Sequence, residues 1–138
     1  MGPRDHPAPT LEVTVGATEV VGPASYRVSF DITNRSRDAT TIVDDWLPHS
    51  DFRAEKEHFH PAIPLAPGER LGLRREVHCP ATPGSPVENA FLILLVSQAG
   101  KEWRVFTRLR IEALEEHSVL PIVEAITAQP VGFRANAG

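Results

Sequence analysis

The sequence is poor in the residues and motifs that carry most catalytic chemistry. Its 138 residues include a single cysteine, Cys79, which cannot form an internal disulfide, so nothing implies an oxidising compartment. It contains no glycine-rich phosphate loop, G-x-S-x-G nucleophile elbow or paired-cysteine metal motif. We therefore expect a protein that is not an enzyme and that needs no cofactor.

Long apolar runs and an excess of positive charge are also missing. The formal net charge is -4, which argues against nucleic acid and anionic membranes as partners. No window approaches the length of a transmembrane helix, and residues 1–9 lack the apolar core of a signal peptide. These absences predict a soluble, cytoplasmic chain without membrane insertion.

What the sequence does have is short alternating segments separated by turn formers. It is 41% hydrophobic, with 13 prolines and 9 glycines, which fits one globular domain with a real core and favours an all-β fold. Alternation and turn spacing predict about seven strands, among them residues 11–15 with a continuation at 19–21, 26–33, 40–46, 71–77, 91–96 and 103–111. Residues 48–67 alternate too weakly for a conformation to be assigned.

The clearest local signal is a hairpin from Asn89 to Ile111. Residues 91–96 are apolar without interruption, which is typical of a strand buried on both faces. Gly100 suits the left-handed position of a longer hairpin loop. On the returning strand Trp103, Val105, Leu109 and Ile111 share one face, and the other face carries Arg104, Phe106, Arg108 and Arg110.

The first strand of this hairpin has an apolar face that needs a cover. If Phe91, Ile93 and Leu95 point into the core, the outward face consists of Leu92, Leu94 and Val96, and such patches are uncommon on monomers. The segment 113–138 is too apolar for a disordered tail, and its first residues, 113–117, could form one helical turn. We expect this segment to cover the strand, either within one chain or across a homodimer.

The expected organisation is therefore a flexible arm at residues 1–10, a sandwich at 11–112 and a C-terminal extension at 113–138. Residues 26–111 resemble a broad group of bacterial immunoglobulin-like modules. The shared features are Asn34 and Ser36 in an N-x-S turn, Leu65-Ala66-Pro67-Gly68-Glu69, Val77, Pro80, Pro83-Gly84, and Gly100 followed by Trp103. The resemblance implies an immunoglobulin-like antiparallel β-sandwich and recognition of a sugar or a protein.

Two groups of residues suggest chemistry and are weighed against simpler interpretations. His58 and His60 would share one face of a strand and could form a metal-dependent site, but two histidines alone more often belong to a polar loop. His78 and Cys79 are neighbours, so on a strand they point to opposite faces and cannot act together. We expect Cys79 to be a buried, inert thiol.

The arginine face and the two tryptophans leave two binding alternatives. The arginines could hold an anionic sugar or an acidic partner surface, or form an ordinary solvated face; Trp46 and Trp103 could stack on sugars, but we expect both in the core. The main prediction is a non-enzymatic, self-associating protein-interaction domain, and the alternatives are a carbohydrate-recognition module and a metal site. The candidate interface residues are Leu92, Leu94, Val96, Arg104, Phe106, Arg108, Arg110, Leu120 and Ile122.

Overall fold

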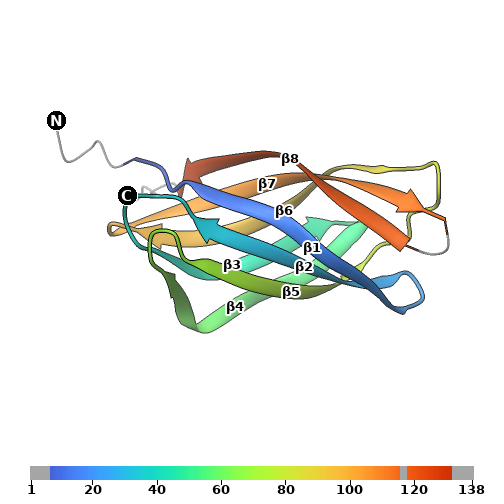
Figure 1. Ribbon diagram of the computed structural model, residues 1–138, viewed down its shortest axis with the longest axis horizontal. Coiled ribbons are helices and arrows are strands. Elements are labelled where there is room, and N and C mark those ends of the chain that lie inside the picture. Colours follow the sequence, from blue (N-terminus) through green and yellow to red (C-terminus); the bar gives the residue numbers. More distant parts are fainter. Residues whose placement is uncertain (1–6, 116–117, 132–138) are drawn as a thin grey trace.

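The computed structural model describes residues 7–115 and 118–131, and within these residues every regular element is a β-strand (Figure 1). The prediction of an all-β chain is confirmed, although with eight strands and not about seven. In chain order they are β1 (Leu11–Gly22), β2 (Ser25–Asn34), β3 (Thr40–His49), β4 (Phe52–Leu65), β5 (Arg70–His78), β6 (Val87–Gln98), β7 (Lys101–Leu114) and β8 (Ser118–Pro130). No helix that could cross a membrane occurs in these residues.

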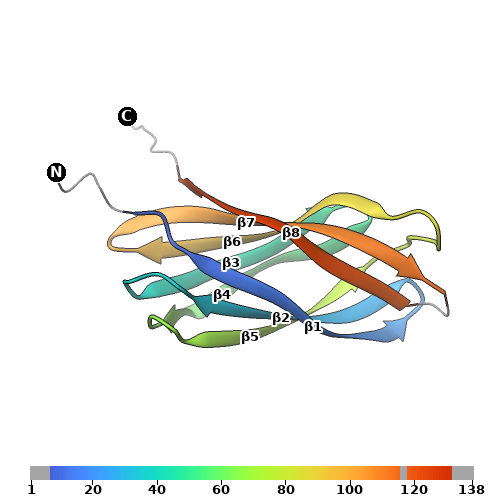
Figure 2. The ribbon, with the colours of Figure 1, turned by 45° about the horizontal axis from the view of Figure 1, so that its top comes forward.

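All eight strands belong to one antiparallel sheet with the order β1-β2-β5-β4-β3-β6-β7-β8. The sheet curls until its first and last strands, β1 and β8, lie beside each other (Figure 2). The result is a nearly closed, barrel-like molecule with its core on the inside.

The ladder is weakest between β4 and β5. Only Arg53 and His78 pair across this junction, and from Ala54 onward β4 continues along β3 alone. The junction divides the strands into a group of three, β1-β2-β5, and a group of five, β4-β3-β6-β7-β8.

Strand β6 faces the opposite way from the sequence-based expectation. Leu92, Leu94 and Val96 are fully buried in the core, and Phe91, Ile93 and Leu95 point outward and are half-buried. The register with β7 explains this, because Leu94 lies opposite Val105 and Val96 lies opposite Trp103, whose side chains are buried. Directly opposed residues of antiparallel strands share a face.

The turn that sets this register is tighter than expected. It contains only Ala99 and Gly100, with φ of 53° and 77°, as in the two-residue turns whose twist matches that of the flanking strands. The left-handed conformation expected for Gly100 is therefore confirmed, but in a two-residue turn and not in a longer loop.

The C-terminal extension joins the sheet of its own chain. Strand β7 runs on to Leu114, so strand replaces the start of the helical turn expected at 113–117; residues 116 and 117 lie outside the described part. Strand β8 pairs with β7 from Leu114 opposite Ser118 to Trp103 opposite Pro130. It extends the sheet sideways and leaves the outward face of β6 uncovered.

Most of the arm expected at residues 1–10 lies outside the described part, which begins at residue 7. The last residue of that arm is held in place, because the amide of Thr10 donates to Ser36 Oγ at 2.8 Å.

Candidate binding site

The outward face of β4, β3, β6 and β7 carries a shallow hollow of about 370 Å³. We call it the outer hollow. Its floor is aromatic and aliphatic, and its sides are charged. The lining residues are Asp44, Trp46, Lys56, Ile93, Leu95, Arg104 and Phe106.

Strand register brings these side chains together. One row across the sheet contains Trp46, Ile93 and Phe106, and the next row contains Leu95 between Asp44 and Arg104. Opposed residues share a face, so both rows point outward. Phe106 also packs edge-to-face against Phe91, with ring centroids 6.1 Å apart, which holds its ring on this face.

Trp46 is the most informative residue of the outer hollow. We expected it in the core, but its relative exposure is 38%. The Lys56 ammonium lies 4.9 Å from the centroid of its ring, a cation–π contact. Trp103, at 6% exposure, lies in the core as expected.

The arginine face is divided between the outer hollow and ion pairs within the chain. Arg104 lines the outer hollow and has no acidic side chain within ion-pair distance in the part of the chain that is described. Arg108 Nε lies 3.4 Å from Glu124 Oε1. Arg110 pairs with Glu88 and Glu112, and the hydrogen bond with Glu112 raises the pKa of Arg110.

The remaining interface candidates lie elsewhere. Leu92, Leu94 and Val96 are enclosed in the core, so in this fold they cannot contact a partner. Leu120 and Ile122 are exposed on the edge strand β8 and do not line the outer hollow.

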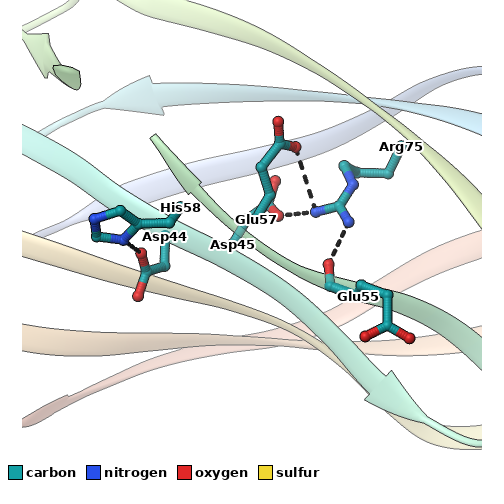
Figure 3. A network of polar contacts seen from close by, with 6 residues as sticks. All are labelled: Asp44, Asp45, Glu55, Glu57, His58 and Arg75. Atoms are coloured by element: carbon teal, nitrogen blue, oxygen red, sulfur yellow. Dashed lines mark hydrogen bonds and ion pairs between the residues drawn. The ribbon is translucent and has the colours of Figure 1, made fainter. Parts of the chain in front are cut away.

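A charged network lies at the β4–β5 junction (Figure 3). The fully buried carboxylate of Asp45 pairs with Arg75 of β5, whose guanidinium also donates to the carbonyl of Glu55 and lies 3.7 Å from Glu57 Oε1. Burial lowers the pKa of Arg75. These contacts join β3, β4 and β5 where backbone pairing between β4 and β5 is missing.

The two histidines share a face of β4, as predicted, with ring centroids 4.6 Å apart. His58 Nδ1 forms a hydrogen bond with Asp44. No group of three or more His, Cys, Asp or Glu side chains that could hold a metal ion occurs among the described residues. The arrangement is a hydrogen-bonded His–Asp pair beside a second imidazole.

Cys79 and His78 point apart, as expected for neighbours in extended chain. The Cys79 side chain is buried, which raises its pKa, whereas His78 is exposed. The pair therefore has no geometry for nucleophilic catalysis.

Sequence reasoning missed five of the lining residues: Asp44, Trp46, Lys56, Ile93 and Leu95. The facing of Ile93 and Leu95 follows once a two-residue turn at Ala99-Gly100 is assumed, because that turn places Val96 opposite Trp103. For Lys56 no such signal exists, since it lies in a stretch without alternation.

Comparison with known proteins gives no further guide: no protein-family model, no curated protein and no solved structure matches the chain. Function must therefore be argued from the outer hollow.

Proposed function

We propose that this chain is a non-enzymatic binding domain that recognises a saccharide in the outer hollow. The observation that carries the proposal is the exposed ring of Trp46, set in an apolar floor with charged side chains around it. Ligand sites combine apolar walls with a few polar groups that fix orientation. A sugar ring matches this surface, because its C–H face packs on an aromatic ring while its hydroxyl groups reach the polar rim.

We also propose that the fold is an immunoglobulin-like sandwich with one added strand. The division into β1-β2-β5 and β4-β3-β6-β7-β8, joined by a single residue pair, supports two facing layers. The turn pattern that resembles bacterial immunoglobulin-like modules supports the same assignment. In this assignment β8 is the addition.

Protection of the free strand edges favours recognition by a sheet face. Strand β4 carries Pro61 and Pro64, β8 carries Pro121 and Pro130, and β5 directs the charged Arg75 inward. Prolines and inward charges at sheet edges hinder the addition of another strand. Binding through β-strand addition is thus disfavoured.

A second copy of the chain is the other possible occupant of this face. That expectation rested on a second apolar face of β6 and on the apolar tail. Leu92, Leu94 and Val96 now lie in the core, and residues 118–130 form β8 within the same chain. The tail is therefore satisfied without a partner. The outward face of β6 stays open, and because charged side chains and the exposed ring of Trp46 lie on it, we favour the saccharide as its occupant.

The proposal is tested by affinity electrophoresis of the full chain in gels containing a panel of neutral and acidic polysaccharides. We expect retardation by at least one polymer and an affinity at least about tenfold lower for Trp46→Ala, a change of about 1.4 kcal/mol. Leu120→Ala, which removes an exposed apolar side chain on β8, is the control and should bind like the wild type.

Light scattering on the same samples separates the occupants. Retardation that Trp46→Ala leaves unchanged contradicts the proposal. The proposal is also contradicted if no polymer retards the chain, its mass in solution is twice 15.2 kDa, and Trp46→Ala halves that mass. The face would then belong to a second copy.

A further inference from the structure

We infer that the saccharide is acidic, and that Lys56 and Arg104 hold its carboxylate groups at opposite sides of the outer hollow. The inference rests on the proposed function and adds the chemical class of the ligand.

The first argument is the charge around the outer hollow. The chain has a formal net charge of -4, yet two cationic side chains line this site. In the described ranges neither Lys56 nor Arg104 has an acidic partner, whereas Arg108 and Arg110 on the same strand face are both paired with glutamates. The site therefore offers positive charge that the chain itself does not neutralise.

The second argument concerns Asp44, the only carboxylate among the lining residues. An acidic ligand would be repelled by an exposed Asp44. Its side chain, however, is 13% exposed and bonded to His58 Nδ1. The partner of Asp44 thus lies within the chain, and the exposed charges of the outer hollow are those of Lys56 and Arg104.

The third argument is the span between the two cations. Lys56 lies on β4 and Arg104 on β7, with β3 and β6 between them. At the usual strand spacing their backbones are about 14 Å apart. This width, over a floor containing Trp46 and Phe106, suits an oligosaccharide of several sugar units better than a single ring.

The two cations supply complementary contacts. The guanidinium of Arg104 can bind a carboxylate with two parallel hydrogen bonds, whereas the ammonium of Lys56 acts as a point charge on a flexible stem. Lys56 rests over the Trp46 ring at 4.9 Å. A sugar carboxylate could attract the ammonium away from the ring and expose more of the stacking surface. A polymer of uronic acids supplies both the ring faces and the repeated carboxylates.

The test uses polygalacturonate and alginate, each beside its methyl-esterified form, which keeps the backbone and removes the charge. Dextran sulfate serves as a generic polyanion. We expect the wild-type chain to bind at least one acid form about tenfold or more tightly than its ester, with a preference that falls as salt is raised. Lys56→Met and Arg104→Gln should each reduce this preference several-fold, and the double variant should abolish it.

Arg108→Gln is the matched control, since Arg108 is already paired with Glu124 and does not line the outer hollow; it should keep the preference. Equal binding of an acid and its ester, still dependent on Trp46, overturns the acidic class and leaves the proposed function standing. If the chain binds none of these polymers and no neutral polysaccharide either, both the inference and the proposed function are overturned. The inference is overturned if the double variant Lys56→Met/Arg104→Gln binds the acid form as tightly as the wild type does. It is also overturned if every variant binds dextran sulfate as tightly as the acid form. Either result would place the contact elsewhere.

Discussion

Cys79 follows β5 with its thiol enclosed in the core, at 1% exposure. Its amide donates to the carbonyl of Ala24 at 2.8 Å, which anchors the chain at this end of the barrel. Burial disfavours the thiolate and raises the pKa of Cys79. The side chain therefore links stability to pH.

The sign of this linkage can be measured. The raised pKa means that the folded chain keeps its thiol proton after the unfolded chain has lost it, from about pH 8.5 upward. The free energy of unfolding should be independent of this group below that pH and should decrease as pH rises toward the folded pKa. Urea denaturation at about pH 7 and about pH 9.5 should show a larger decrease for the wild type than for Cys79→Ala.

Burial also raises the pKa of Tyr26, so this group contributes a decrease of the same sign as the tyrosine of the unfolded chain ionises at about pH 10. The comparison with Cys79→Ala separates the two groups, because Tyr26 is present in both chains. Equal decreases for the two chains would show that the thiol contributes nothing to the linkage.

At this same scale, Trp46 was placed in the core by analogy with the core tryptophan of sandwich domains, and alternation would not have corrected that prediction. From the buried Ile42, strict alternation puts Asp44 and Trp46 inward. A register shift between Ile42 and Asp44 inserts one extra residue, so Asp45 turns inward and Trp46 outward. A bulge of this kind leaves no mark in the hydrophobic pattern.

Among the elements, one buried ion pair, Asp45 with Arg75, links β3 to β5 beside the β4–β5 junction. Arg75→Met should leave the carboxylate of Asp45 buried without a counter-charge, at a cost of about 3–5 kcal/mol. Adding Asp45→Leu should recover much of this loss, because an apolar pair can replace a buried ion pair. Urea denaturation of both single variants and the double variant gives the coupling energy directly.

Arg74→Met is the control for this cycle, since Arg74 is exposed on β5 and should change stability by at most about 0.5 kcal/mol. A cost below about 1 kcal/mol for Arg75→Met would mean that the pair does not hold the junction.

Strand β4 could not be predicted because residues 55–58 are all exposed, and Pro61 and Pro64 interrupt the residues that follow. Those features are tolerated on an edge strand and are mistaken for a loop. Within the helical turn expected at 113–117, Ala113 and Leu114 are strand, because pairing of β7 with β8 overrides the local preference there. Strands β2, β5 and the β6–β7 hairpin were predictable because one face of each is buried along its length.

For the whole molecule, the pairing of β8 with β7 of its own chain predicts a monomer of 15.2 kDa in light scattering. A chain ending at Ala113 should aggregate or unfold at lower urea, because it exposes the pairing edge of β7 and removes the buried Val119. A chain ending at Val131 keeps every described strand and should behave like the full chain. A chain ending at Ala113 that stays monomeric and equally stable would contradict this.

The all-β class was predictable at this scale, since composition and alternation decide it. The closure was not, because the pairings of β2 with β5 and of β3 with β6 join segments far apart in the chain. Nothing in the local pattern of either partner specifies the other.

The strand order also governs how the chain reaches its fold in time. The hairpins β1–β2, β3–β4 and β6–β7–β8 join neighbours and can form early, but β2–β5 and β3–β6 must close long loops before their contacts repay the lost chain entropy. Folds dominated by such distant pairings form slowly, on the scale of milliseconds to seconds. Because β1 lies beside β8, β1 must wait during synthesis until β8 has been made before the sheet can curl into its nearly closed form.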